Sequence, residues 1–131
     1  MTHEPGFIAL ITVVIFAAVA LMVSVSTVAF SIDQVQATVA DELAARAHAA
    51  ATFCAEEALM KLKASLSYGG NETFSVGQDT CRVLAVGGVG NTNRTVQVTS
   101  TVMEIHRKID IFVPKVRRTL EVSRWRDVQN F

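Results

Sequence analysis

Residues 7–32 read FIALITVVIFAAVALMVSVSTVAFSI and contain no charged, amide or imidazole side chain, no glycine and no proline. About 20 apolar residues in an α-helix cross the hydrocarbon core of a bilayer, which is about 30 Å thick. The polar groups of the stretch are hydroxyls, which can bond to carbonyls of the preceding helical turn and so stay satisfied in lipid. The stretch therefore predicts a transmembrane helix, with a membrane as the first partner of the chain.

The rest of the chain has the composition of a soluble domain. The protein is 131 residues long, so residues 33–131 leave room for one small domain with a marginal hydrophobic core. Twelve basic side chains balance twelve acidic ones, which excludes a strong overall field toward nucleic acid. Acidic residues predominate over 33–63 and basic residues from Arg94 onward, so complementary surfaces are expected within one subunit or between copies.

Residues 33–68 continue the helical pattern beyond the apolar stretch. No glycine or proline occurs between Phe7 and Tyr68, and alanine, the strongest helix former, is frequent. The sequence Tyr68-Gly69-Gly70-Asn71 predicts the end of this helix. Apolar residues at steps of three or four predict an amphipathic stripe along it: Ile32, Val35, Val39, Leu43, Ala47, Ala50, Cys54, Ala58 and Leu62.

Residues 69–131 predict an antiparallel sheet. Alternating patterns indicate four or five strands, over 72–76, 80–86, 94–102, 105–113 and 119–125, with Pro114 ending the fourth of these segments. The alternation changes phase between Val102 and Ile105, which predicts a bulge or a tight hairpin there. The helix would cover one face of the sheet, and the fold class is α+β: a long N-terminal helix packed on a small C-terminal antiparallel sheet. Four helix residues are expected to supply this cover: Phe53, Leu59, Leu62 and Leu66.

Three interpretations fit an apolar stretch at the N-terminus. A secretory signal peptide has an apolar core of about 7–15 residues followed by a cleavage site, and residues 7–32 are too long for it. A plain single-pass anchor is the second interpretation. The third depends on residues 1–6, MTHEPG, a short hydrophilic segment that ends in Gly6 immediately before Phe7.

This arrangement resembles the class III leader of type IV prepilins and pseudopilins. In that family a prepilin peptidase cuts after the glycine and methylates the new N-terminus. The resemblance implies cleavage between Gly6 and Phe7, methylation of Phe7, and a filament core made of the helix over 7–32. The partners it implies are other pilins, in a homo- or hetero-polymer, together with the pilus assembly machinery. The segment has His3 and Glu4 but no Lys or Arg, so positive charge gives its orientation little support.

Residue 11 departs from the family pattern. Most members carry a glutamate at the fifth position after the cut, where this chain has Ile11. That acid pairs with the N-terminal amine of a neighbouring subunit, and some members without it are thought to cap a filament. The resemblance therefore implies a minor or tip-located subunit as well as a major one.

The two cysteines, Cys54 and Cys81, permit one disulfide if this part of the chain is exported, and are two free thiols if it is cytosolic. Closing the loop between them would contribute roughly 3–4 kcal/mol in the chain-entropy description. The resemblance favours the disulfide, because in some pilin-like proteins such a bond ties the helix to the sheet. The α+β arrangement of helix and sheet is also that of pilins.

No assembled catalytic motif or metal-ligand spacing is present in the sequence, so neither an enzyme nor a cofactor or metal site is expected. A basic segment could contact a polyanion such as DNA, since pili of this kind can take up DNA, or could be a solvated or inter-subunit face. Its residues are Arg107, Lys108, Lys115, Arg117, Arg118, Arg124 and Arg126.

The sequence thus favours a structural subunit of a type IV pilus-like filament or type II secretion pseudopilus. Its expected organisation is a leader over 1–6, a filament-core helix over 7–32, an amphipathic helix over 33–68 and a β-sheet over 69–131. The precursor would lie in the inner membrane with the sheet outside the cytoplasm, and the assembled form at the cell surface. The alternative is a single-pass membrane protein that does not polymerise and carries a small extracytoplasmic binding or adhesion domain.

Overall fold

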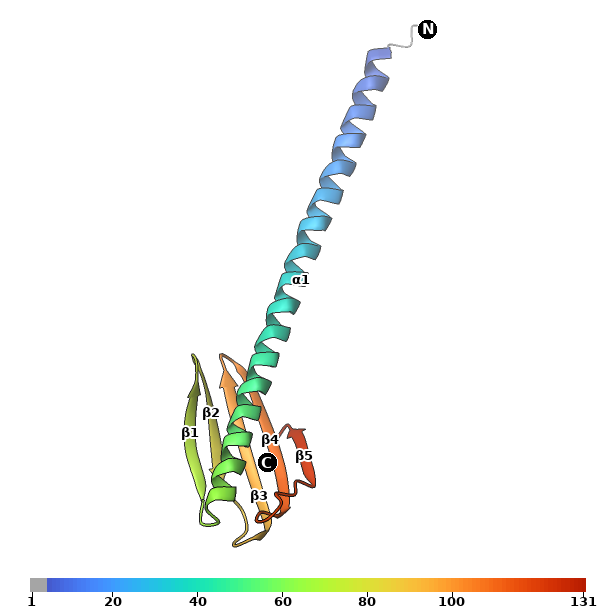
Figure 1. Cartoon of the computed structure of the whole chain (residues 1–131). Coiled ribbons are helices and arrows are strands. Elements are labelled where there is room, and N and C mark those ends of the chain that lie inside the picture. The colour runs from blue at the N-terminus through green and yellow to red at the C-terminus, as the bar shows by residue number, and fades with distance from the viewer. Residues whose placement is uncertain (1–4) are drawn as a thin grey trace. The chain divides into compact units, whose positions relative to one another are not determined.

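The computed structural model describes residues 5–131, which form one long helix followed by five strands (Figure 1). The predicted α+β class is confirmed. Asp41–Phe131 form one compact unit, which we call the globular unit, and the chain before Asp41 forms another. The first four residues of the proposed leader lie outside the described residues, so only its last part, Pro5 and Gly6, is seen.

Helix α1 runs over Pro5–Ala64. Proline suits the first turn of a helix, where its missing N–H is not needed, and Lys61 and Lys63 in the last turn favour the negative end of the helix dipole. The predicted end of the helix at residue 68 was wrong, because the chain leaves the helix after Ala64. The physical reason lies in the sheet: residues 65–69 must reach β1, and a buried arginine of the sheet, described below, binds two carbonyl groups of this connection.

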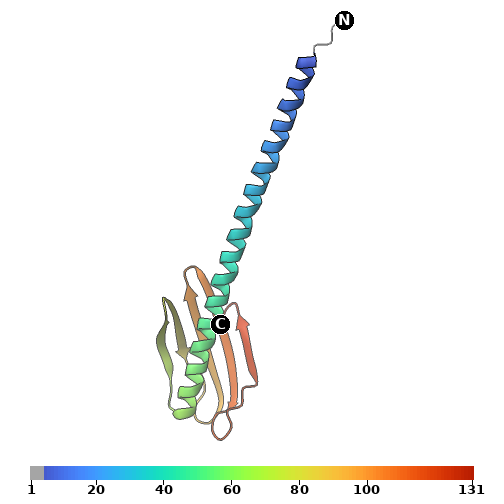
Figure 2. The same cartoon turned by 45° about the horizontal axis from the view of Figure 1, so that its top comes forward.

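The strands form a simple antiparallel meander of order β1-β2-β3-β4-β5. The C-terminal part of α1 lies across one face of this sheet, as the two views agree (Figure 1, Figure 2). Val102 pairs directly with Ile105, so a two-residue turn joins the third and fourth strands and the tight hairpin is confirmed. The strands are β1 Gly70–Val76, β2 Asp79–Ala85, β3 Thr92–Val102, β4 Ile105–Lys115 and β5 Arg124–Val128.

Two predicted strand boundaries were wrong. Strand β4 continues through Pro114 to Lys115. The Phe112 carbonyl accepts a hydrogen bond from the Ser123 N–H on the β5 side of β4. Residues two apart in a strand direct their backbone polar groups to the same side, so an N–H at position 114 would also face that side. Strand β5 does not extend that far, so the N–H that Pro114 lacks has no partner to lose. The last strand is β5 over Arg124–Val128 and not 119–125, because residues 116–123 are needed to reverse the chain.

The core lies between the stripe of α1 and the inner face of the sheet. Ala47, Ala51, Ala55 and Ala58 are buried, and their small side chains let the helix backbone approach the strands closely. Phe53 was expected to cover the sheet, but 45% of its surface is exposed because it lies on the opposite side of the helix from the alanine stripe. The other three expected residues do contact the core, and the sheet supplies Val83, Val96, Val98, Ile109, Ile111 and Val113.

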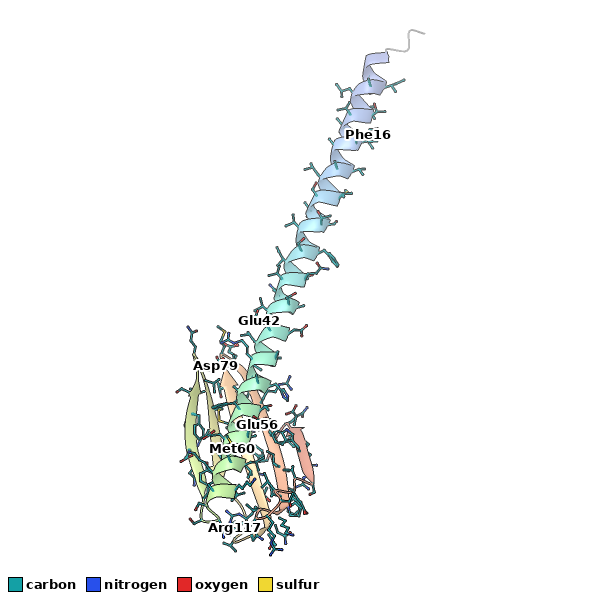
Figure 3. All side chains as sticks on the ribbon, viewed as in Figure 1. Phe16, Glu42, Glu56, Met60, Asp79 and Arg117 are labelled. Atoms are coloured by element: carbon teal, nitrogen blue, oxygen red, sulfur yellow. A yellow bond between two sulfur atoms is a disulfide. The ribbon has the colours of Figure 1, made fainter. Side chains whose placement is uncertain are left out.

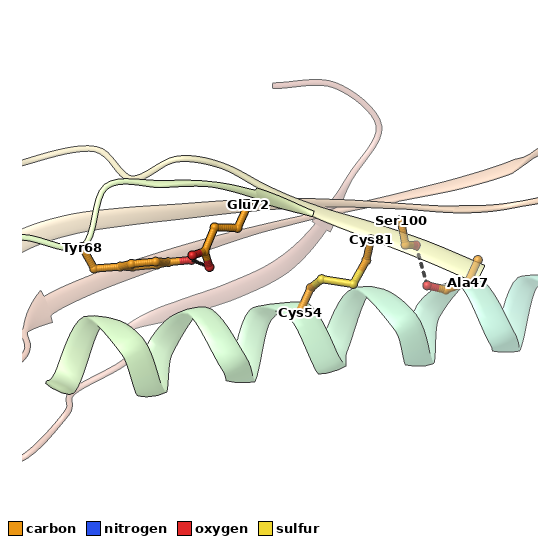
Figure 4. Close-up of a disulfide and its surroundings, with 6 residues drawn as sticks. All are labelled: Ala47, Cys54, Tyr68, Glu72, Cys81 and Ser100. Atoms are coloured by element: carbon orange, nitrogen blue, oxygen red, sulfur yellow. Dashed lines mark hydrogen bonds between the residues drawn. A yellow bond between two sulfur atoms is a disulfide. The ribbon is translucent and has the colours of Figure 1, made fainter. Parts of the chain in front are cut away.

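One disulfide and one buried hydrogen bond fix the helix to the strands (Figure 4). Cys54 and Cys81 form a disulfide between α1 and β2, with their Cα atoms 6.2 Å apart. About two helical turns before Cys54, the Ala47 carbonyl accepts a hydrogen bond from the Ser100 hydroxyl of β3 at 2.6 Å, and both residues are buried. The helix is therefore attached to two neighbouring strands along one line of contact.

Arg94 of β3 is the only arginine or lysine among the buried residues of the described chain, with 3% of its surface exposed. It follows the inward alternation of Val96 and Val98, and its guanidinium donates to the carbonyls of Leu66 and Tyr68 at 3.0 Å each. These are the residues that lead from the helix into β1. One buried cation thus fixes the connection between the helix and β1.

We expect the double change Cys54→Ala with Cys81→Ala to lower the free energy of unfolding by about 3 kcal/mol, because it frees a long loop in the unfolded chain. Denaturant unfolding of the full chain in detergent, followed by the single tryptophan, Trp125, measures this loss. Reductant should have the same effect on the unchanged protein and none on the double variant. Two alkylated thiols in the folded protein without reductant would contradict the disulfide.

Arg94→Met should keep the apolar stem of the side chain but leave the Leu66 and Tyr68 carbonyls without their donor. The expected loss is about 2 kcal/mol, since hydrogen bonds to charged groups contribute about 1.5–3 kcal/mol. Arg82→Met is the matched control, because Arg82 is exposed on β2 and its loss should stay within about 0.5 kcal/mol. Equal effects of the two changes in the same unfolding experiment would show that Arg94 has no special structural role.

Candidate functional site

The first candidate site is the apolar segment itself. Its side chains are exposed throughout: Phe16 exposes 75% of its surface and Ile11 41%. Between residues 6 and 64 the helix is long and apolar enough to cross a membrane, by length and composition, and none of its most apolar part is buried. An exposed apolar surface of this size on a helix needs lipid or other helices to cover it.

The polar groups within this segment are satisfied by the helix. The Thr12 hydroxyl donates toward the carbonyls of Ile8 and Ala9, at 3.1 and 2.8 Å. The hydroxyls of Ser24, Ser26, Thr27 and Ser31 likewise donate to carbonyls three or four residues earlier, at 2.8–2.9 Å. The expected back-bonding is confirmed, so no hydroxyl of the segment requires water as a partner.

Gly6 and Phe7 lie in the first turn of α1, where backbone N–H groups have no partner within the helix. A Cβ built on Gly6 would meet nothing within 4 Å, so packing within this chain does not account for a glycine there. Phe7 is exposed, as is Ile11 one turn later. The geometry leaves the Gly6–Phe7 bond accessible, and whether it is cut stays a prediction.

The predicted basic segment does not form one surface. Arg124 and Arg126 of β5 both bind Asp110 of β4, with guanidinium-to-carboxylate distances of 3.2 and 3.7 Å. Asp110 is only 6% exposed, and this clamp joins the edge strand β5 to the sheet. A buried carboxylate shared by two arginines ties up much of their charge, which leaves less for a polyanion.

Residues 107 and 108 point to opposite faces of β4, as neighbours in a strand do. Arg107 is on the helix side, and its Nε is buried without a hydrogen-bond partner in the described chain. The Lys108 ammonium lies 5.4 Å from the centre of the Phe131 ring and 3.3 Å from the Asn130 side-chain oxygen. The remaining three predicted residues, Lys115, Arg117 and Arg118, are exposed together at the end of β4.

A polar cluster joins the end of the helix to β1. The Lys61 ammonium is 2.6 Å from a carboxylate oxygen of Glu72, and the Tyr68 hydroxyl donates to the same oxygen at 3.0 Å (Figure 4). Burial raises the pKa of Tyr68 to about 12, helped by its hydrogen bond to Glu72. The hydrogen bond from Lys61 lowers the pKa of Glu72. The cluster, which we call the clasp, links the end of the helix to β1.

No group of three or more His, Cys, Asp or Glu side chains able to hold a metal ion occurs within residues 5–131. Sequence reasoning also missed the role of Arg94, and it did not predict that Asp110 is buried. The inward alternation with Val96 and Val98 could have revealed Arg94, because it puts residue 94 on the core face. Asp110 is expected from the sequence to neutralise part of the basic segment, but its pairing with Arg124 and Arg126 depends on β5, whose bounds were predicted wrongly.

Comparison of the chain with protein families, with curated proteins and with solved structures finds no match.

The chain contains a single tyrosine, so its titration can be followed directly. At about pH 11 we expect the Tyr68 phenol to remain mostly protonated, as its pKa of about 12 requires, whereas an ordinary tyrosine would be mostly ionised. The pKa of Tyr68 in the folded chain lies above its ordinary value of 10.0. The contribution of Tyr68 to the free energy of unfolding is therefore complete below pH 10 and is lost as pH rises through about 12. Phenolate absorbance measures the titration.

Glu72→Gln should move the titration midpoint of Tyr68 down toward 10. Glu57→Gln is the control and should move it less, because Glu57 contributes least to the raised pKa. For Glu72 itself the sign is opposite: its lowered pKa stabilises the fold above its ordinary pKa, and this contribution disappears as pH falls through the folded value. A Tyr68 midpoint near 10 in the folded, unchanged protein would contradict the clasp.

Proposed function

We propose that this chain is a structural subunit of a type IV pilus-like filament or type II secretion pseudopilus, stored in a membrane before assembly. The observation that carries the proposal is the apolar part of α1, residues 7–32, which is exposed all round and belongs to the same helix that packs on the sheet. Fully burying a large apolar side chain is worth about 1.5–3 kcal/mol, so leaving this segment in water would cost on the order of tens of kcal/mol. Lipid and a bundle of identical helices are the two environments that avoid this cost.

Two further features support a filament over a permanent anchor, and two more bear on the location and on the kind of subunit. The position of Gly6 before Phe7 matches the cleavage site of prepilins, and the helix continues without a break toward a small α+β unit, as in pilins. The disulfide suits an extracytoplasmic location, where such bonds persist. Ile11, in place of the usual acid, favours a minor or tip-located subunit, since no charge at that position would pair with a neighbour's N-terminal amine.

Assembly is then a transfer of residues 7–32 from lipid to a core of neighbouring helices. The two environments are similarly apolar, so the transfer needs little net free energy of burial. Specificity must come mainly from the globular units and from packing between helices. The prepilin peptidase and the assembly machinery would act on the precursor in the inner membrane.

If the proposal holds, shearing intact cells should release the chain in surface filaments. Ile15→Lys should reduce its amount in that fraction roughly a hundredfold, because a lysine at the centre of an apolar helix costs about 2.5–3.5 kcal/mol and 1.4 kcal/mol corresponds to tenfold. Ile15→Leu is the matched control and should leave the amount unchanged. Immunoblotting of sheared and membrane fractions measures both.

A chain that stays entirely in the membrane fraction after shearing, when co-produced with a pilus assembly system, would contradict a filament subunit. It would indicate the single-pass protein with a binding domain instead.

A further inference from the structure

The two ends of the globular unit carry opposite charge. Strand register defines the ends: β1 and β3 run from one end to the other, and β2 and β4 return. The turns after β1 and after β3 therefore share one end with the part of α1 near Arg46, which pairs with Asp79 at 2.8 Å. The chain around Leu66 and Tyr68 and the segment after β4 share the other end.

The first end is acidic. Asp41 and Glu42 are exposed on α1, one turn before Arg46, and Glu104 is exposed in the turn between β3 and β4. None of these three carboxylates has an ion-pair partner among the described residues. Arg46 beside them is paired with Asp79, and Arg107 of β4, the cross-strand neighbour of Ser100, is a second cation at this end, so the carboxylates outnumber the cations. Figure 3 shows Glu42 and Asp79 near this end of the sheet.

The opposite end is basic, and Figure 3 shows Arg117 there. Lys115, Arg117 and Arg118 are exposed after β4, and Lys63 lines the same shallow groove as Leu120 of that segment. Two carboxylates lie among them: Glu121 is exposed and forms an isolated backbone bridge with Lys115, and Glu56 lines the same groove as Lys63. We call Asp41, Glu42 and Glu104 the acidic end, and Lys63, Lys115, Arg117 and Arg118 the basic end.

The basic end is held in one conformation. Asn91 accepts from the Arg117 backbone N–H through its side chain at 2.6 Å, and its own carbonyl accepts from the Val116 N–H at 3.0 Å. Val116 is fully buried, and Arg118 has a φ of 72°, a conformation that costs a residue with a Cβ about 1–2 kcal/mol. The loop thus presents two arginines outward from a fixed backbone, which reduces the entropy lost on binding.

We propose that the basic end of one copy docks against the acidic end of the next copy, so that globular units stack end to end. The contact joins different surfaces of identical chains, and such a heterologous contact repeats into an open chain when the rotation does not close a ring. The partner at each end is a second copy of the chain, because the basic end is complementary in charge to the acidic end that every copy carries. This inference rests on the proposed filament and supplies its directional contact.

Charge pairs at a surface are individually weak, at about 0.2–1 kcal/mol, and several act together here. The apolar helices hold copies at high local concentration, so a modest contact is enough to set their order. Salt should weaken the stacking, since the charges on both ends are exposed.

Charge exchange tests the contact in the full chain in detergent. Arg117→Glu with Arg118→Glu reverses much of the basic end, and Asp41→Lys with Glu42→Lys reverses much of the acidic end. Zero-length coupling of carboxylates to amines, on mixed isotope-labelled and unlabelled chains, reports contacts between copies. The unchanged protein should yield cross-links from Lys63 or Lys115 to Asp41, Glu42 or Glu104.

Each variant alone should lose about tenfold in the yield of cross-links to Glu104, the carboxylate that both variants keep, and this loss corresponds to about 1.4 kcal/mol. An equal mixture of the two variants should recover it, because each reversed end then meets a complementary one. Arg82→Glu, an exposed reversal in the middle of the sheet, is the control and should leave the yield unchanged. Circular dichroism confirms that all variants remain folded.

Absence of these cross-links in the unchanged protein, or no recovery in the mixture, would overturn end-to-end stacking. So would a basic end that binds duplex DNA and forms no contact with the acidic end. The proposed function fails separately: a chain with both ends in contact but with no processing after Gly6 would retain the contact and lose the pilin assignment.

Discussion

The apolar side chains of residues 7–32 must be removed from water, and the rest of the molecule is arranged around that requirement. Their helix has no internal polar group that needs a solvent partner, because each hydroxyl bonds to its own backbone. Such a segment has a similar free energy in lipid and in a bundle of similar helices. Under the proposed function, this equivalence would let one segment serve first as a membrane anchor and then as a filament core. It also means that burial of this helix cannot by itself select the correct neighbour.

Selection and stability then depend on the globular unit, which is small enough to need reinforcement. The disulfide between Cys54 and Cys81 and the buried hydrogen bond from Ser100 attach the helix to β2 and β3. Arg94 fixes the turn from helix to sheet, and Asp110 holds the short edge strand through two arginines. These links stabilise a rigid unit whose two ends differ in charge. A rigid unit with distinct ends can give direction to an assembly whose apolar core is nearly uniform.

Much of the fold could be predicted because its signals are periodic. The change of phase between Val102 and Ile105 revealed the hairpin, and the alanine stripe revealed the buried side of the helix. The errors arose where a distant residue decided the outcome. Arg94 fixes the connection after the helix from 26 and 28 residues away in sequence, and Pro114 is tolerated because β5 stops short of it. The basic residues were predicted as one segment of surface, but two of them, Arg124 and Arg126, pair with Asp110. Two more, Arg107 and Lys108, are neighbours in β4 and so point to opposite faces of the sheet. Local patterns carry no information about such partners.

The account depends most on what happens at Gly6. A permanent anchor has no need to expose a free amine at Phe7, whereas a filament subunit of this family is released from its leader at that bond. Intact mass and N-terminal peptide analysis of the chain, produced together with a prepilin peptidase, tests this directly. We expect a mature chain that begins at Phe7 with a methylated amine, and we expect Gly6→Val to remain uncut while Gly69→Val is processed normally. A mature chain that still begins at Met1 would contradict the account.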